Sequence, residues 1–144
     1  MGAVHQVVRR DNATAVPFLE RSRDLAAQVD DRETLAEALR HLGVADHAAG
    51  RLEAAREHLT RSSEIRRTAG HQAAVAANMV GLGYIAAAAG RRDDALRILT
   101  EADALARTHE AHAIVRQVAQ ARAHLGQSPP QPPYGARNVT AFQA

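Results

Sequence analysis

Cysteine, lysine and tryptophan are absent from this chain of 144 residues, and it has only two tyrosines and two phenylalanines. Without cysteine, the chain can form neither a disulfide framework nor a metal site with thiolate ligands. Residues 1–10 are too short to cross a membrane and lack the apolar centre of a signal peptide. We therefore expect a cytoplasmic protein without a membrane segment.

Neither positive nor negative charge dominates the composition. The 18 basic residues, all of them arginine, face 16 acidic residues, which gives a formal net charge of only +2. This balance argues against direct binding of nucleic acid, which usually requires a clear excess of basic residues. The use of arginine alone is typical of a GC-rich genome, and we expect a bacterial source.

What the chain does contain is an internal repeat. The pair Leu42-Gly43 recurs forty positions later as Leu82-Gly83, and the run from Ala48 to Arg51 recurs from Ala88 to Arg91. The further identities in the same register are Ala55 with Ala95, Leu59-Thr60 with Leu99-Thr100, and Arg67-Thr68 with Arg107-Thr108. A fixed period between 20 and 50 residues is the signature of a stacked-repeat architecture.

The apolar spacing within each copy indicates two helices. Leu35, Leu39 and Leu42 lie at positions i, i+4 and i+7, and so do Val75, Met79 and Leu82. Glycine then ends this first helix in each copy, at positions 50 and 90. The inward residues of the second helix are Ala55, Leu59, Ser62 and Ile65 in one copy, and Ala95, Leu99, Ala102 and Leu105 in the other.

Each copy is therefore a helical hairpin. One hairpin cannot bury its apolar stripe alone, so the copies must stack. We predict an all-α stack of helical hairpins, and we expect Leu42 and Leu82 to be buried between helices.

These residues resemble the tetratricopeptide repeat family. Gly43 and Gly83 match the small position of the family's first helix, Leu39 and Met79 its large position, and Gly50 and Gly90 its helix end. The small and bulky positions of the second helix are matched by Ala55 and Leu59, and by Ala95 and Leu99. Three departures stand out: the usual aromatic is Asp46 or Ala86, the closing proline is Arg67 or Arg107, and the period is 40 and not 34. The longer period resembles the variant found in bacterial regulators of the LuxR and antibiotic-regulatory-protein type.

The repeat register divides the chain into a helical domain and a tail. The domain, residues 1–125, holds a partial repeat (1–31), two full repeats (32–71 and 72–111) and a capping helix (112–125). We expect a short helical start and then helices near 12–29, 32–49, 52–69, 72–89, 92–108 and 112–125, with Asn12 or Thr14 capping the first of these. In the capping helix, Val115, Ala119 and Ala123 take the positions that are inward in the full repeats, whereas Arg122 replaces a leucine on a face exposed to water.

Residues 126–144 form the tail, which has four prolines and no acidic residue. Proline lacks an amide donor and breaks helices, so this composition predicts a flexible or polyproline-II segment. It is either a disordered terminus or a proline-rich ligand for a partner domain.

Catalysis and cofactor binding have no candidate residues. His109 and His112 are spaced i, i+3, whereas a zincin helix needs histidines at i, i+4 around a glutamate, and a solvated turn explains both. Gly81-Leu82-Gly83 lacks the lysine and further glycine of a phosphate loop. No serine, threonine or lysine stands in a nucleophile motif. We predict no enzymatic activity, no cofactor and no metal.

The resemblance implies a binding groove on the inner face of the first helices. The family's groove positions correspond to Glu37, Arg40, Val44 and His47 in the first full copy, and to Ala77, Val80, Tyr84 and Ala87 in the second. The capping helix adds Gln117, Gln120 and His124. This set is mixed and mildly apolar, and without the groove it would be an ordinary solvent-facing surface. Tyr84 is its only aromatic residue, and such rings are common contact anchors.

Two functions remain open. The chain is either a non-enzymatic module that binds a protein or peptide, or a detached sensor or coupling segment of a multidomain transcriptional regulator. The repeat is also interrupted at residue 1, which leaves an apolar face (Val4, Val7 and Val8) without the helix that would cover it. We therefore expect either a longer native protein or self-association through the N-terminal end.

Overall fold

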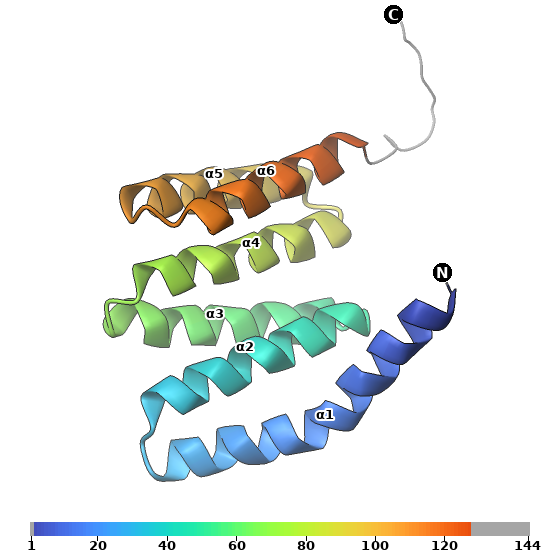
Figure 1. Cartoon of the computed structure of the whole chain (residues 1–144), viewed down its shortest axis with the longest axis vertical. Coiled ribbons are helices and arrows are strands. Elements are labelled where there is room, and N and C mark those ends of the chain that lie inside the picture. The colour runs from blue at the N-terminus through green and yellow to red at the C-terminus, as the bar shows by residue number, and fades with distance from the viewer. Residues whose placement is uncertain (1, 128–144) are drawn as a thin grey trace, which may run out of the picture.

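The computed structural model describes the backbone of residues 2–127 and the side chains of residues 14–126. Within this range the chain forms six α-helices and no strand: α1 (Gly2–Gln28), α2 (Arg32–Ala48), α3 (Leu52–Thr68), α4 (Gln72–Ala88), α5 (Arg92–Thr108) and α6 (His112–Gln127). Successive helices run antiparallel and stack along the long axis of the molecule (Figure 1). The predicted all-α stack of helical hairpins is confirmed.

Each repeat is one hairpin, α2 with α3 and then α4 with α5, and neighbouring hairpins meet through α3 and α4. Figure 1 shows α2 and α6 nearer the viewer than α3 and α5, so that first and second helices lie on different sides of the stack. The core runs between them. Its largest fully buried side chains are Leu39, Leu59, Leu99, Val75, Val118, Asn78 and Ser62.

The two helices of a hairpin approach closely where the first helix carries glycine. A methyl group built on Gly43 would lie 2.8 Å from Cγ of Leu59, and one on Gly83 would lie 2.9 Å from Cδ2 of Leu99. These distances are shorter than a normal van der Waals contact. The Leu-Gly pair of the repeat is therefore a packing requirement, because leucine of the second helix occupies the space that a side chain would need.

The turns also repeat with a period of forty. Gly50 and Gly90 end the first helices with φ of 82° and 80°. The turns between repeats hold Asp30, Gly70 and Glu110, again at positive φ. A left-handed residue at each helix end stops the helix and turns the chain, and glycine adopts it without strain.

The N-terminal segment differs from the prediction of a separate short helix and a break near residue 12. α1 is one helix of 27 residues that contains Pro17, and Figure 1 shows it bending along its length. The position equivalent to Gly50 and Gly90 is Arg10. Without a glycine that position lacks an easy left-handed stop, and the helix continues through it.

Two buried faces also differ from the prediction. Leu42 is 2% exposed, as expected, but Leu82 is only partly buried because a cavity adjoins it. In α6 the buried residues are Val118, Ala121 and Leu125, whereas Val115 is partly exposed and Ala119 and Ala123 are exposed. In a full repeat, the face with Val115, Ala119 and Ala123 would pack on the second helix of the same hairpin. Within the described residues, no helix follows α6 to cover this face.

Candidate partner-binding surface

The predicted groove residues of α2 differ in their exposure and in their contacts with other residues. Glu37 is exposed and accepts ion pairs from Arg66 of α3 (Nη2 to Oε2, 2.7 Å) and His41 (Nε2 to Oε1, 2.8 Å). Val44 is 45% exposed, which is unusual for a valine in a helical stack. His47 is half-buried, and this burial lowers the pKa of its imidazole. α2 therefore presents an apolar side chain between residues of mixed polarity.

Arg40 belongs to a hydrogen-bonded chain that joins three helices. Its Nη1 donates to Oδ1 of Asn78 at 3.2 Å, and Nδ2 of Asn78 donates to Oγ of Ser62 at 3.1 Å. Ser62 in turn donates to the carbonyl of Ala36 at 2.7 Å. Asn78 is 1% exposed and Ser62 is fully buried, yet both are satisfied. We name these residues (Arg40, Ser62 and Asn78) the polar joint between α2, α3 and α4.

The equivalent contact one repeat later is apolar. Forty positions on from the polar joint stand Val80, Ala102 and Val118, which lie together in one buried cluster. We name these residues the apolar joint between α4, α5 and α6. Val80 is 5% exposed, because α6 packs broadly on α4, whereas α2 and α4 touch only sparingly. Val80, which the sequence placed in the groove, is therefore buried between α4 and α6.

Tyr84 and His124 are brought together by the packing of α6 on α4. Their ring centroids lie 5.7 Å apart with the planes tilted by 58°. Tyr84 is half-buried against the apolar cluster of the second repeat, while His124 is exposed. Of the other predicted groove residues, Gln117 and Gln120 on α6 are exposed and Ala77 and Ala87 on α4 are half-buried. The structure therefore brings Tyr84 and His124 into contact and connects Arg40 to α4 by a hydrogen bond. Glu37, in contrast, pairs with Arg66 of α3.

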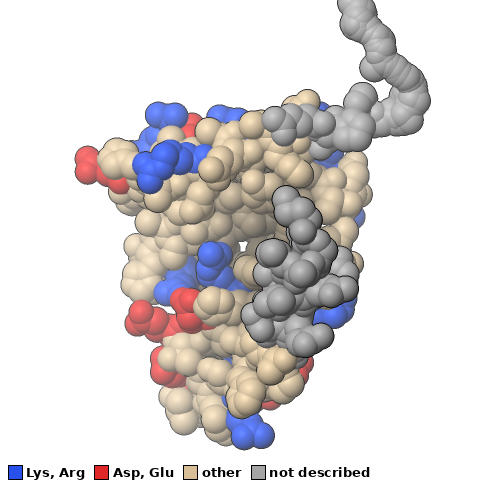
Figure 2. Space-filling view, turned by 45° about the vertical axis from the view of Figure 1, so that its right-hand side comes forward, with Lys and Arg blue, Asp and Glu red and all other residues tan. Residues whose placement is uncertain are grey.

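The surface on this side of the stack is uneven. Figure 2 shows a small hollow at mid-height, with basic and acidic side chains gathered together to one side of it. Uncharged residues cover most of the remaining described surface in that view.

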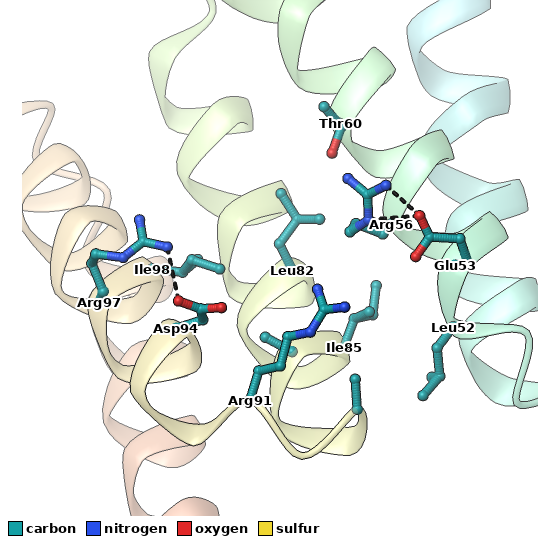
Figure 3. Close-up of a pocket in the computed structure, with 12 residues that line it drawn as sticks. Leu52, Glu53, Arg56, Thr60, Leu82, Ile85, Arg91, Asp94, Arg97 and Ile98 are labelled. Carbon is teal, nitrogen blue, oxygen red and sulfur yellow. Dashed lines mark hydrogen bonds and ion pairs between the residues drawn. The ribbon is translucent and has the colours of Figure 1, made fainter.

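A second concave feature lies between α3, α4 and α5, and sequence reasoning missed it. Its volume is about 270 Å³. The lining comprises Leu52, Glu53, Arg56 and Thr60 of α3, Leu82, Ile85 and Ala86 of α4, Ala89 and Arg91 of the turn that follows, and Asp94, Arg97 and Ile98 of α5. Figure 3 shows two ion pairs on the rim, Arg56 with Glu53 and Arg97 with Asp94.

The charges at this cavity are only partly paired. The hydrogen bond from Arg56 lowers the pKa of the Glu53 carboxyl, and the positive charges of Arg56 and Arg91 act in the same direction. Arg91 itself makes no hydrogen bond or ion pair through its side chain within residues 14–126. The only sign of this site in the sequence was Ala86, the small residue at the family's usual aromatic position.

The described residues offer little for other kinds of site. Among them, no three His, Asp or Glu side chains are grouped so that they could hold a metal ion. His109 and His112 are exposed at the turn before α6, where the sequence placed them. Within residues 2–127, no helix combines the length and the apolar character needed to traverse a bilayer.

Comparison with models of known protein families gives a match to part of the chain. Residues 1–68 match the family model described as tetratricopeptide repeat, which supports membership of a tetratricopeptide repeat family for that part of the chain. This segment covers α1, α2 and α3. Neither the comparison with curated proteins nor that with solved structures found a match. Tetratricopeptide repeats are generally modules of protein–protein interaction, typically without enzymatic activity of their own.

Proposed function

We propose that this chain is a non-enzymatic, cytoplasmic interaction module that binds a protein or peptide across its first-helix face. We define that face as Glu37, Arg40, Val44, His47, Tyr84, Gln117, Gln120 and His124. The observation that carries the proposal is the Tyr84–His124 ring contact at 5.7 Å between α4 and α6. An amphipathic ring held in place by a neighbour loses little freedom on binding, which makes it an effective contact anchor.

Val44 and Arg40 extend this anchor towards α2. Val44 offers exposed apolar area, and Arg40 is oriented by Asn78 while remaining half-exposed. A partner with an apolar residue next to an acidic one would match this pair. The binding mode would be that of a helix or extended peptide lying across the stack.

The proposal is tested with exposed residues, since Arg40 and Tyr84 also support the fold. The variant Val44→Glu/Gln120→Glu changes the first-helix face, and Arg61→Gln/Arg67→Gln on the exposed side of α3, with the same change in net charge, is the matched control. Captured proteins from the native host are compared by quantitative mass spectrometry. We expect partners that the control retains to be lost from the first variant. Equal retention by both variants would refute the assignment of the face.

We further propose that the N-terminal end self-associates, with a second copy covering α1. Phe18 and Leu25 share one face of α1, and Val29 directly follows the helix; their side chains are 72%, 53% and 73% exposed. They line an open groove of about 390 Å³ with the start of α2. Val4, Val7 and Val8, the residues predicted to be uncovered, lie among side chains outside the described range.

Light scattering across a concentration series tests this association. We expect a dimer that Phe18→Ser/Leu25→Ser converts to a monomer, with unchanged helix content by circular dichroism. A parent protein that stays monomeric at high concentration would refute the association while leaving the first-helix face untested by this experiment.

The finer family assignment rests on the period. The left-handed turn residues at 30, 70 and 110, and those at 50 and 90, recur every forty positions in the structure. This spacing favours the long-period variant of bacterial regulators and thereby the alternative function, a sensor or coupling segment of such a regulator. Reading the genomic DNA upstream of Met1 tests it, and an upstream stop codon before any phosphate-loop sequence would count against the regulator.

A further inference from the structure

The cavity between α3, α4 and α5 lies where the preceding repeat has a buried carboxylate that is paired with an arginine and a histidine. In that repeat Asp46 is 6% exposed, and its Oδ1 accepts from Nε of Arg51 at 3.0 Å. Its Oδ2 lies 2.6 Å from Nδ1 of His58. Asp46, at the end of α2, thus binds the start of α3 and satisfies both of its carboxylate oxygens.

Forty positions later, the same three places are occupied by Ala86, Arg91 and Ile98, and all three line the cavity. The arginine is kept, but its carboxylate partner has become a methyl group. The volume of about 270 Å³ is large enough for more than one water molecule. The second repeat therefore has space and a cation where the first has an internal ion pair.

The residues that line the cavity favour a ligand with a carboxylate next to an apolar group. Leu82, Ile85 and Ile98 give the cavity apolar walls, as Figure 3 shows. Of its three arginines, Arg56 and Arg97 are paired with Glu53 and Asp94. Arg91 makes no ion pair within residues 14–126, although its charge acts on the Glu53 carboxyl. The lining holds three arginines and two acidic residues, so the cavity carries an excess of positive charge.

We propose that this cavity binds an aspartate or glutamate side chain of a partner protein, flanked by an aliphatic residue. The carboxylate pairs with Arg91, as Asp46 pairs with Arg51, and the aliphatic residue packs on Leu82 and Ile85. Residues 126–144 contain no acidic residue, so the chain's own tail does not supply this side chain.

This second site is separate from the first-helix face. On α4 the cavity residues Leu82 and Ala86 lie about half a turn away from Ala77 and Tyr84, given 3.6 residues per turn. A partner at one face leaves the other open. The inference thus goes beyond the proposed function, and each can fail without the other.

The test uses nuclear magnetic resonance on the full ¹⁵N-labelled chain, titrated with the probe acetyl-Leu-Glu-Leu-amide. We expect saturable shifts of backbone amides at the starts of α3 and α5. The matched probe acetyl-Leu-Gln-Leu-amide should give none of comparable size, because it lacks the charge. Shifts of equal size with both probes would overturn the proposal, and so would shifts confined to the first-helix face.

Two variants make the test specific. Arg91→Gln should weaken binding of the glutamate probe about tenfold or more, since it removes a charge-assisted pair. The double variant Ala86→Asp/Ile98→His rebuilds the ion-paired triad of the first repeat, so it should abolish binding while the melting temperature is kept or raised. Unchanged binding in Arg91→Gln would overturn the proposal.

A final titration uses inorganic phosphate at matched ionic strength as a competitor of the glutamate probe. If phosphate displaces the glutamate probe and causes the same shifts at lower concentration, the cavity is a site for free anions, and the assignment to a partner's carboxylate is wrong. We expect phosphate to compete weakly, since it gains nothing from Leu82 and Ile85.

Discussion

The two full repeats share a backbone plan but use equivalent positions in different ways. At the polar joint, a buried asparagine and serine connect α2, α3 and α4 and orient Arg40. At the apolar joint, valine and alanine fill the same places between α4, α5 and α6. Hydrogen bonds have defined directions, whereas apolar contacts do not. The polar joint therefore fixes how α2 sits relative to α4, although these two helices touch only sparingly.

A similar contrast separates the ends of the two hairpins. Asp46 fills its site and pairs with Arg51 and His58, whereas Ala86 leaves a cavity and an unpaired Arg91. Both repeats keep the same helix positions and the same close contacts at glycine. The side chains between the helices differ, and they form a polar joint or an apolar one, and a filled site or an open cavity. Function can thus differ between copies of one repeat without a change of fold.

The largest expected effect separates Leu42 from Leu82. Leu42 is 2% exposed, so Leu42→Ala should reduce the free energy of unfolding by about 2–5 kcal/mol, as for other buried leucines. Leu82 adjoins the cavity and is only partly buried, so Leu82→Ala should cost about half as much. Urea unfolding followed by circular dichroism measures both. Equal losses would mean that the two repeats bury this position alike and that the cavity is closed in solution.

The next effect concerns the polar joint. Asn78→Val should cost about 1–3 kcal/mol, because it deprives Arg40 of its acceptor and Ser62 of a donor in a buried place. The triple variant Arg40→Val/Ser62→Ala/Asn78→Val copies the apolar joint and should recover most of this loss. If the triple variant is less stable than Asn78→Val alone, the two joints are not interchangeable.

Much of this fold was accessible from the sequence. The four helices between residues 32 and 108 begin where predicted and end within one residue of the prediction. Apolar spacing and the glycines at 50 and 90 supplied those boundaries, and both act locally. The same local rules explain the error in α1, where the break was predicted from repeat register although Arg10 stands in the place of the glycine.

The contacts between repeats were less accessible. The burial of Val80 depends on α6, and the role of Asn78 depends on Ser62 and Arg40, sixteen and thirty-eight positions away. The cavity is visible only when Ala86, Arg91 and Ile98 are compared with Asp46, Arg51 and His58. Tyr84 and His124 were both chosen for the groove, but their ring contact could not be derived from spacing within one helix.

A smaller effect is expected at the turns between repeats. Gly70 has φ of 80°, and the equivalent Glu110 has φ of 55°. A side chain in this left-handed region costs about 1–2 kcal/mol, part of which the greater freedom of glycine in the unfolded chain offsets. Glu110→Gly should therefore stabilise the chain by about 0.5–1 kcal/mol, and Gly70→Ala should destabilise it by about 1 kcal/mol. Thermal melts of the two variants check the signs, and shifts of the same sign would contradict the shared turn.

The smallest effect concerns His47, whose equivalent in the second repeat is Ala87. Burial lowers the pKa of the His47 imidazole below its ordinary value of 6.5, so the unfolded chain binds a proton more readily than the folded one. Stability from this residue is therefore complete above pH 6.5 and is lost as the pH falls towards the folded pKa.

His47→Ala, which copies the second repeat, removes this contribution while every other titrating group stays in place. The urea midpoint of the parent should fall further between pH 7.5 and pH 5.5 than that of the variant. Parallel pH profiles would show that the imidazole of His47 is as well solvated in the folded chain as in the unfolded one.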